Sequence, residues 1–427
     1  MTIEMQAKDI DLKGIVRAGD TVFWGQGTSE PLTLSEALVN QRAGIGPIDV
    51  FLGASFSTTL QPEHADFLSF TSYGAIGANQ RLSKAGVLQI LPCHYSQIPR
   101  LIARGELRCD VAFVQLSASN VAGEYSHGVG NDYMLDAARR ARIVIAEVND
   151  QAPWTYSSES LNRAQIDYVV HTSRPVVALS AGTIGEVERQ IADHTASYIP
   201  DGAVLETGIG AVPDAILSAL HGHRDLGVHT GTIGDSIIDL MESGAVTNLR
   251  KPVDRGISVT GVLFGSERLF RFAHENKAIR LSPVRYTHSA SVMAQFDTLF
   301  AINSAVEVDL TGQVNAEVSD TAYLGAVGGQ VDFVRAATSS AHGRSIIALP
   351  STAQSGARSR IVARLSGCVT TTPRSDADLV ITEWGAAELR GQTIPERARR
   401  MIAIAHPSFR EQLEREAHGL IRKSMLL

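Results

Sequence analysis

Short apolar runs alternate with amphipathic segments along the whole chain. The runs have the length of buried strands, and the amphipathic segments repeat apolar residues at the spacing of a helix. Examples of the runs are DTVFWG, VAFVQLS, AVLETGIG and SIIALPS, and examples of the helical segments are LTLSEALVNQRAG, YMLDAARRAR and IPERARRMIAIA. Strands and helices in alternation predict an α/β fold with mostly parallel sheets that helices cover on both faces.

The chain of 427 residues is longer than one hydrophobic core usually supports, which favours more than one domain. The helical segment GEVERQIADHTASYI precedes a strand, after which a second cycle of strands begins. We therefore place a domain boundary near residue 185, with one α/β domain over 1–185 and a second over 186–427. The two halves share their order of elements, although no residue-level repeat is evident.

Charge and composition narrow the range of partners. A formal net charge of −7, spread along the chain, argues against binding to a nucleic acid backbone. The first residues have no basic or apolar leader pattern, and no apolar run reaches the roughly 18 residues needed to span a bilayer. We expect a cytoplasmic protein whose three cysteines, Cys93, Cys109 and Cys368, are buried thiols without metal or redox spacing.

The segment AVLETGIGAVPDAILSAL joins a predicted strand to a predicted helix through a glycine loop. Glycines let backbone N–H groups approach a ligand, and the start of a helix adds partial positive charge. The loop is therefore a candidate cradle for a phosphate or a thioester oxyanion, with a simple tight turn as the alternative. It lacks the third glycine and the acidic partner of a dinucleotide fingerprint, so a nicotinamide cofactor is not expected. Its residues are Gly208, Ile209, Gly210, Ala211 and Val212.

Two further glycine loops have the same character. They are GQG at 25–27 and the segment YLGAVGGQVDF, which contains Gly325, Gly328 and Gly329. Loops at the carboxyl ends of strands are the usual ligand position in α/β sheets. No signature of a serine hydrolase, zincin or P-loop enzyme occurs, and the histidine-rich segment HGHRDLGVHT lacks the companion ligands of a metal site. We expect no bound metal.

Ordered sequence blocks across nearly the whole chain resemble the acetyl-CoA hydrolase/4-hydroxybutyrate CoA-transferase family. In the first half these blocks include GQGTSEPLTLSEAL, CDVAFVQLS and IVIAEVNDQAPWTY. In the second half they include DLGVHTGTIGDSIIDLMESGAVTN, FAINSAVEVDLTGQVNAE and VTTTPRSDADLVITEWGAAELRG. Many blocks in family order are stronger evidence than any one glycine loop.

The resemblance implies two similar open α/β domains with an acyl-CoA site in the cleft between them, in a homo-oligomer such as a dimer. Coenzyme A would be substrate and product, and no tightly bound cofactor is expected. Members of the family transfer coenzyme A from an acyl thioester to a free carboxylate. They use a glutamate that forms first an acyl anhydride and then a glutamyl-CoA thioester, so a side-chain carboxylate is indispensable to that route.

The segment LGVHTGTIGDS departs from the family pattern LGxHTExxxDG at the position of that glutamate. His229, Thr230 and Asp235 are retained, and His229 is kept as a member of the candidate catalytic set. Gly231 stands where the glutamate is expected, and Ser236 replaces a glycine. A glycine has no atom that can form an anhydride. The sequence therefore predicts an acyl-CoA site without its usual nucleophile.

Other residues are candidates to replace the missing carboxylate. Glu206 precedes the first glycine loop and is the best-placed carboxylate. Asp235 lies four residues past the position of the missing glutamate, and structural roles explain Glu307 and Glu317 better. His127, in the altered segment SASNVAGEYSHGVGND, is a candidate general base for water or substrate, with a hydrogen-bonded loop histidine as the alternative.

The resemblance also implies binding residues for coenzyme A. These are the five residues of the first glycine loop, Asn303 in the INSA block, and the three glycines of YLGAVGGQVDF. Their expected roles are contacts to phosphate or pantetheine and stabilisation of an oxyanion by backbone N–H groups. Arg344 would meet a phosphate of coenzyme A, unless it is an ordinary surface cation.

Three functions stay open at the level of sequence. The first is an enzyme that acts on an acyl-CoA thioester with altered chemistry, such as hydrolysis or carbon–carbon bond cleavage. The second is conventional transfer of CoA to a small carboxylate through another residue. The third is a protein that binds CoA without catalysis, and the fold alone does not decide among them.

Overall fold

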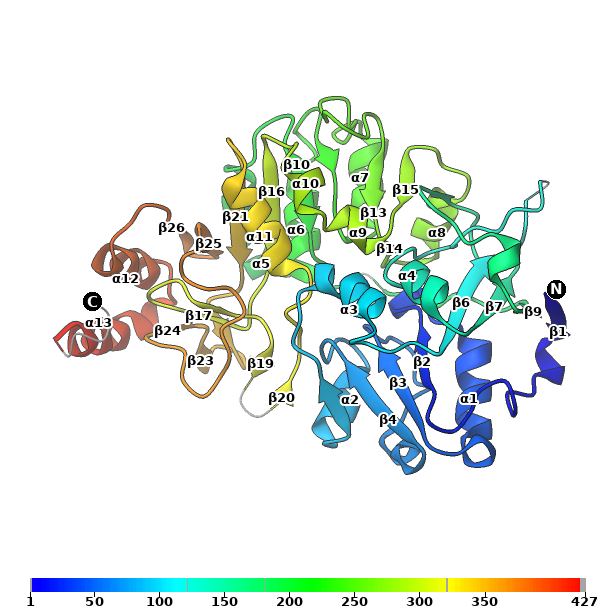
Figure 1. The fold of residues 1–427 in the computed structure, drawn as a ribbon. Coiled ribbons are helices and arrows are strands. Elements are labelled where there is room, and N and C mark those ends of the chain that lie inside the picture. The colour runs from blue at the N-terminus through cyan, green and yellow to red at the C-terminus, as the bar shows by residue number, and fades with distance from the viewer. Residues whose placement is uncertain (1, 121, 181, 320–321, 423–427) are drawn as a thin grey trace.

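Two large β-sheets covered by helices make up most of the molecule (Figure 1). The computed structural model describes residues 2–120, 122–180, 182–319 and 322–422. The first sheet has eight strands in the order β1-β9-β7-β6-β2-β3-β4-β5, and every neighbouring pair is parallel. The second has six strands in the order β11-β10-β16-β21-β25-β26, of which the last pair alone is antiparallel. The predicted α/β fold with mostly parallel sheets is confirmed.

The first sheet uses strands from the amino-terminal part of the chain. They are β1 (Ile3–Gln6), β2 (Thr21–Trp24), β3 (Ile48–Leu52), β4 (Leu68–Ser72), β5 (Leu88–Ile90), β6 (Val111–Ser117), β7 (Ile143–Asn149) and β9 (Tyr168–Thr172). All seven residues of β6 are buried, because helices cover both faces of a parallel sheet and leave no solvent side. This burial explains why VAFVQLS reads as a continuous apolar run rather than an alternating one.

Helices lie on both faces of this first sheet. Alternate strand residues point to opposite faces, so Val22 packs with α1 (Leu32–Ile45) while Phe23 packs with α3 (Ile98–Arg104) and α4 (Met134–Arg140). The helix α2 (Asn79–Lys84) contributes to the same side as α1. The sheet is therefore the middle layer of three.

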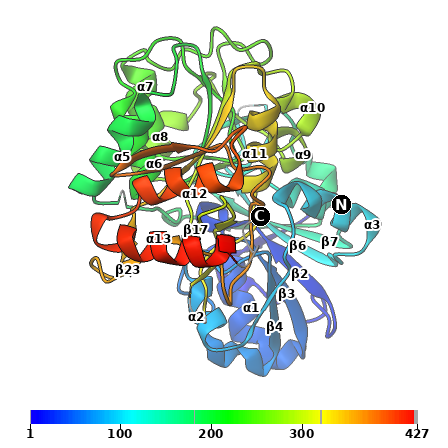
Figure 2. The ribbon, with the colours of Figure 1, turned by 90° about the vertical axis from the view of Figure 1, so that its left-hand side faces the viewer.

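The second sheet follows the same plan with strands from the carboxyl-terminal part. They are β10 (Val204–Thr207), β11 (Gly227–Val228), β16 (Leu299–Asn303), β21 (Arg344–Ala348), β25 (Leu379–Thr382) and β26 (Gly385–Glu388). Helices α5 (Glu186–Ala196), α6 (Ala211–Ala219), α7 (Ser236–Glu242) and α8 (Glu267–Ala273) share one core with it. On its other face lie α11 (Gln330–Ser339), α12 (Ile394–Ala403) and α13 (Pro407–Arg422), the last two side by side in Figure 2.

Small elements join the two halves. The strand β8 (Tyr156–Ser157) pairs with β15 (Ile279–Leu281), which pairs in turn with β13 (Ser258–Thr260). The strand β14 (Val262–Leu263) pairs with β12 (Thr232–Ile233). Thr28 Oγ1 of the first half donates a hydrogen bond of 2.7 Å to the Leu263 carbonyl of β14. The predicted boundary near residue 185 falls between the last strand of one sheet and the first of the other. The division into domains at that point stays a prediction.

Each sheet has a point where the strand order reverses. In the first sheet β2 lies between β3 and β6, and in the second β10 lies between β11 and β16. Ligands of open α/β sheets bind outside the carboxyl ends of strands at such points. These ends carry the GQG loop after β2 and the Gly208 loop after β10. The topology therefore places two of the three predicted glycine loops at ligand-binding positions.

The three cysteines differ in burial. Cys93 and Cys109 are buried free thiols, as expected, whereas Cys368 is only partly buried and donates to Glu307 Oε1 at 3.2 Å. Cys368 was expected to be buried, and its loop lies instead at the edge of a small sheet. Within the described ranges no helix is long and apolar enough to cross a bilayer.

Candidate active site

The Gly208 loop connects β10 to α6 at the reversal point of the second sheet. Gly208 N donates to the Ile302 carbonyl at 3.2 Å, which holds the loop against β16. Gly210 has a φ of +117°, a conformation that residues with a Cβ rarely adopt, and α6 begins at the next residue. The Ile209 side chain is 39% exposed. The loop thus presents a free edge and the first turn of a nine-residue helix, as a cradle for an anionic group requires.

Glu206 and Asn303 lie side by side next to this loop. Asn303 Nδ2 donates to Glu206 Oε2 at 2.9 Å. Glu206 is buried, with only 5% of its surface exposed. Burial raises the pKa of Glu206 to about 8. The carboxyl group is therefore protonated at neutral pH, and a protonated carboxyl is a poor nucleophile. The structure brings these two predicted residues together but makes Glu206 an unfavourable replacement for a catalytic carboxylate.

Gly231 lies against the ring of a histidine that no sequence motif indicated. A Cβ built on Gly231 would lie 3.0 Å from Cε1 and 3.2 Å from Nε2 of His288. A Cβ built on Gly329 would lie only 2.4 Å from the same Nε2. The imidazole of His288 therefore occupies the space into which a side chain at either glycine would project. Two predicted site residues meet at one residue that was not predicted.

The His288 ring is enclosed on its other sides. The residue is 6% exposed, and its ring makes edge contacts with Tyr95 (5.0 Å between centroids) and Phe333 (4.8 Å). Nδ1 lies 2.9 Å from Thr287 Oγ1. Burial, together with the nearby His229, lowers the pKa of His288 to about 3. The imidazole is therefore neutral at physiological pH.

His229 supports the segment that carries His288. Its Nε2–H donates to the Thr287 carbonyl at 2.9 Å, and its ring packs 5.0 Å from that of Phe296. His229 is completely buried, and burial lowers its pKa to about 3. In the structure, His229 thus holds residues 287 and 288 in position through its hydrogen bond to the Thr287 carbonyl.

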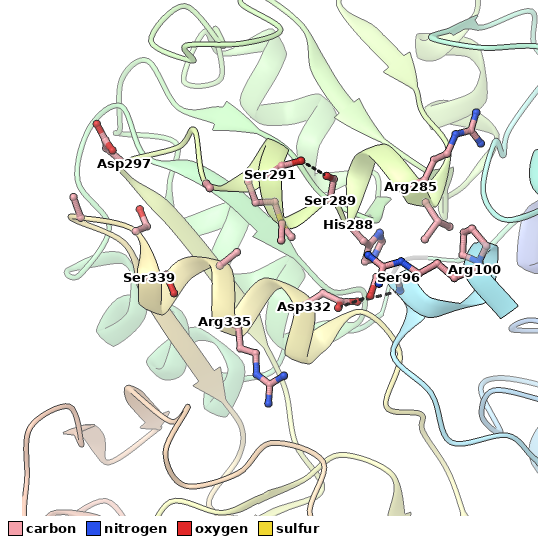
Figure 3. Close-up of a pocket in the computed structure, with 18 residues that line it drawn as sticks. Ser96, Arg100, Arg285, His288, Ser289, Ser291, Asp297, Asp332, Arg335 and Ser339 are labelled. Carbon is pink, nitrogen blue, oxygen red and sulfur yellow. Dashed lines mark hydrogen bonds between the residues drawn. The ribbon is translucent and has the colours of Figure 1, made fainter. Parts of the chain in front are cut away.

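A cavity of about 840 Å³ opens beside His288, between the two halves of the molecule (Figure 3). Ser96 and Arg100 of the first half line one side, and Asp332 and Arg335 of α11 line another. Ser96 Oγ donates to Asp332 Oδ1 at 2.7 Å, which ties the two halves together at the cavity wall. The volume lies in the range of small-molecule sites, and the position at the junction of two halves is typical of them.

The Gly325–Gly329 loop spans the same junction. Ala75 N donates to the Gly325 carbonyl at 2.9 Å, and Tyr95 N donates to the Gly328 carbonyl at 2.8 Å. A Cβ at Gly325 would lie 2.1 Å from the Ala316 carbonyl oxygen, so a side chain is excluded there. The loop is therefore fixed by the first half of the chain while it leads into the start of α11 beside His288.

His127 is a buried residue without side-chain hydrogen bonds among the described residues. It is 1% exposed, neither ring nitrogen has a hydrogen-bond partner among the described residues, and burial lowers its pKa to about 4. No hydrogen bond or ring contact joins it to Gly231, Glu206 or Asn303 within the described ranges. Its proposed role as a general base stays a prediction.

The other candidate carboxylates are engaged in structural contacts. Asp235 accepts hydrogen bonds from the backbone and hydroxyl of Ser266 at 2.8 and 2.7 Å. Glu317 accepts from Tyr323 and Thr371 at 2.6 and 2.7 Å. Glu307 pairs with an arginine and accepts from Asn315 in a small sheet. These contacts agree with the structural roles expected of Glu307 and Glu317 and engage Asp235 in the same way.

Arg344 lies at the opposite end of the second sheet from the Gly208 loop. It begins β21, whose carboxyl end is at Ala348, and its guanidinium pairs with Asp378 at 3.2 Å and Glu388 at 2.8 Å. The Asp378 side chain is 1% exposed, so the arginine neutralises a buried charge. The structure does not bring Arg344 to the other predicted binding residues. Its contact with a phosphate stays a prediction.

No group of three histidine, cysteine or carboxylate side chains suited to a metal ion occurs within residues 2–120, 122–180, 182–319 and 322–422. Sequence reasoning missed His288, because RYTHSAS matches no catalytic pattern. Only a search for side chains near the missing carboxylate would have found it, and such a search needs the fold.

Comparisons with known proteins find relatives over nearly the whole chain. The sequence model of the acetyl-CoA hydrolase/transferase N-terminal domain matches residues 6–180, and that of the corresponding C-terminal domain matches residues 265–417. The chain is 40% identical over 341 residues to 4-hydroxybutyrate coenzyme A transferase of Clostridium kluyveri, covering 80% of each chain. It is 32% identical over 419 residues to succinyl-CoA:cyclohexane-1-carboxylate CoA transferase of Geobacter metallireducens, covering 97% of this chain and 95% of the other. The crystal structure of RipA from Yersinia pestis superimposes with a TM-score of 0.91 at 33% identity, covering 96% of each chain.

Proposed function

The chain belongs to the acetyl-CoA hydrolase/transferase family, and on this premise we propose that it processes an acyl-CoA thioester by a route that forms no glutamyl adduct. Hydrolysis of the thioester is the simplest such reaction. Cleavage of a carbon–carbon bond next to the thioester is another that needs no side-chain nucleophile. Coenzyme A is the product in the first case and part of substrate and product in the second.

One observation carries this proposal. The sequence pattern predicts Gly231 at the position of the family glutamate, and the space beyond its Cα holds the His288 imidazole at 3.0–3.2 Å from a built Cβ. Covalent transfer needs a carboxylate that attacks the thioester carbonyl and then receives the sulfur. The site offers a neutral imidazole in that space instead. This supports a reaction in which water or another group within the substrate takes the role of the nucleophile.

The binding of coenzyme A is assigned to the residues that the fold keeps at the reversal point of the second sheet. The Gly208 loop with its helix start suits a phosphate or the pantetheine chain, and Asn303 lies beside it. The Gly325–Gly329 loop suits the thioester end, because it lies next to His288. A homo-oligomeric state and a cytoplasmic location stay predictions.

Conventional CoA transfer to a small carboxylate is the second candidate, and it would require a substitute nucleophile. Glu206 is the best-placed carboxylate, but its burial, its raised pKa and its hydrogen bond with Asn303 disfavour that role. A CoA-binding protein without catalysis is the third candidate. The cavity of about 840 Å³ supports an enzyme over this third candidate, because it leaves room for a small molecule beside His288.

The test compares thioester turnover with and without acetate as acceptor. A panel of acyl-CoA thioesters is assayed with the wild type, with His288→Ala as matched control, and with the double variant Gly231→Glu/His288→Ala, in which the removed ring leaves room for the carboxylate. We expect the wild type to release products without transferring CoA to acetate. The double variant should transfer CoA and form a glutamyl-CoA adduct that hydroxylamine or borohydride traps.

Two results would contradict the proposal in different ways. An adduct on the wild type together with transfer to acetate would establish the conventional route. Tight binding of acyl-CoA in calorimetry without turnover on any member of the panel would establish the non-catalytic alternative.

A further inference from the structure

The His288 imidazole has one ring nitrogen in contact with a hydroxyl group and one that no hydrogen bond engages within the described ranges. Nδ1 lies 2.9 Å from Thr287 Oγ1, whereas no hydrogen bond from the described residues engages Nε2, which is not among the fully enclosed polar atoms without a partner. Nε2 lies close to Gly231 and Gly329, and the ring occupies the space into which a side chain at either residue would project. The ring also lines the cavity of about 840 Å³ (Figure 3). A bound ligand can therefore reach Nε2.

The Thr287 hydroxyl decides which nitrogen of the ring carries the proton. Its oxygen lies 2.9 Å from His288 Nδ1 but 3.5 Å from the Pro283 carbonyl, which is the outer limit for a hydroxyl hydrogen bond. The Thr287 hydroxyl therefore donates its proton to His288 Nδ1 at the shorter distance, and Nδ1 is the acceptor. A neutral imidazole has one N–H, and it must then be at Nε2. We assign the Nε2–H tautomer on this geometry.

An N–H that no protein group accepts can be satisfied by a bound ligand. The helix α11 begins directly after Gly329, next to His288 Nε2. The first backbone N–H groups of a helix have no partner within the helix. Two kinds of donor, a side-chain N–H and backbone N–H groups, therefore converge beside the two glycines. Convergent donors in a closed site are suited to an oxygen on which negative charge develops.

We propose that His288 is a catalytic residue whose Nε2–H donates a hydrogen bond to the carbonyl oxygen of the bound acyl-CoA thioester. The inference rests on the proposed function and deepens it, because it names the group that takes over at the position of the missing glutamate. His229 is a positioning residue in this scheme, since its Nε2–H holds the Thr287 carbonyl and with it the threonine that sets the tautomer.

For hydrolysis the step balances without a covalent enzyme intermediate. The oxygen of a water molecule forms a bond to the thioester carbon, and the π electrons move onto the carbonyl oxygen, which accepts the Nε2–H hydrogen bond. When the C=O bond forms again, the C–S bond breaks. The thiolate of coenzyme A takes the proton that the water has lost, and the products are a carboxylic acid and CoA. His288 stays neutral throughout, which its low pKa favours.

The test uses a ketone analogue of acetyl-CoA in which a methylene group separates the sulfur from a ¹³C-labelled carbonyl. Its carbonyl stretch is recorded by infrared spectroscopy when bound to the full-length wild type, to His288→Gln and to His288→Phe. We expect a lower stretching frequency in the wild type and His288→Gln, which keep an N–H donor, than in His288→Phe. On the best thioester substrate, kcat of His288→Phe should fall about 10²- to 10³-fold with KM little changed.

Three outcomes would overturn the inference. Equal carbonyl frequencies in the wild type and His288→Phe, with the analogue bound to both, would refute it and leave the proposed function intact. Failure of the wild type to bind the analogue would refute both. If His288→Phe does not fold, ¹⁵N NMR of the wild-type histidines decides, because an Nδ1–H tautomer of His288 would refute the inference while an Nε2–H tautomer supports it.

Discussion

The contact between Gly231 and His288 makes each residue depend on the size of the other. The ring is wedged between two glycines and two aromatic side chains, so it has little freedom to move aside. Close packing of this kind transmits the effect of even one added methyl group. The absence of a side chain at residue 231 is therefore a requirement for this position of the imidazole.

Gly231→Ala should disturb the site although it adds a single methyl group. Its Cβ would lie 3.0 Å from His288 Cε1, and we expect the free energy of unfolding to fall by about 1–3 kcal/mol and turnover to fall with it. Gly234→Ala is the matched control, because its Cβ would have no neighbour closer than 3.5 Å. Urea unfolding and kcat measure both effects. Equal stability of the two variants would show that the ring moves aside freely.

Glu206→Gln should change how stability depends on pH. Burial raises the folded-state pKa of Glu206 to about 8, above its ordinary value of 4.5, so between these values the folded state binds a proton that the unfolded state has lost. The free energy of unfolding of the wild type should therefore decrease as pH rises from about 5 to 8, by roughly 1.4 kcal/mol for each unit of pKa shift. Glutamine has nearly the shape of the protonated acid and does not titrate.

Urea unfolding of the wild type and Glu206→Gln at pH 5, 6.5 and 8 provides the measurement. We expect the two proteins to differ little at pH 5 and the variant to be the more stable at pH 8. A constant difference across this range would mean that Glu206 is ionised in the folded protein and would reopen its role as a nucleophile.

At the scale of elements, the position of a loop relative to the strand ends separates the candidate binding residues from structural ones. The Gly208 loop follows the carboxyl end of β10 and Asn303 ends the adjacent parallel strand β16, whereas Arg344 begins its strand. Backbone N–H groups at helix starts converge only at the carboxyl edge of such a sheet. The two ends of the second sheet therefore call for different experiments.

Gly210→Ala should weaken the binding of coenzyme A. Its φ of +117° is strained for any residue with a Cβ, so the loop must change shape to accept alanine. We expect the Kd for CoA in calorimetry to rise at least about tenfold, which corresponds to 1.4 kcal/mol. Gly222→Ala is the control, since that glycine has an ordinary φ and no atom within 4 Å of a built Cβ. An unchanged Kd in Gly210→Ala would argue against this loop as the cradle.

Arg344→Ala should lower stability and leave the affinity for CoA unchanged. The variant removes one of two arginines that pair with the buried Asp378, while Arg390 still donates at 2.7 Å. We expect a loss of about 1–3 kcal/mol in the free energy of unfolding, because the buried carboxylate of Asp378 would keep only one of its two arginine partners. A rise in the Kd for CoA without loss of stability would instead support the phosphate contact predicted from the sequence.

At the scale of the whole molecule, the two sheets are tied together at several places. The β8–β15 pair, the Thr28–Leu263 hydrogen bond and the Ser96–Asp332 contact each join the two halves. The candidate site lies among these connections, so its geometry depends on both halves. We propose that the two predicted domains behave as one unit in unfolding.

Tryptophans report on each half separately. Trp24 is buried in β2 of the first sheet, and Trp384 follows β25 of the second. With fluorinated tryptophan in a Trp154→Phe background, ¹⁹F NMR during urea unfolding should give the same midpoint for both, as a single cooperative transition requires. Midpoints that differ by more than the error would show that the halves unfold independently. Thr28→Val, which removes one connection, should lower both midpoints together.

The alternating pattern of strands and helices was sufficient to predict the fold class, because each buried element has a local signal. VAFVQLS is buried over its full length and reads as such, and the predicted helices over LTLSEALVNQRAG and IPERARRMIAIA are present as α1 and α12. The strand β4 and the helix α3 were missed. LSFTS mixes exposed and buried positions, and α3 has only seven residues, too few for a clear helical period.

The sequence by itself determined that residue 231 has no carboxylate and that glycine loops stand at strand ends, since both are properties of residue identity and local order. Only the tertiary structure decided that His288 fills the space beside Gly231, that Glu206 is buried against Asn303, and that Arg344 lies at the far end of its sheet. These facts depend on which distant segments pack together. Periodicity reports whether a residue is buried, but it carries no information about the partner against which it is buried.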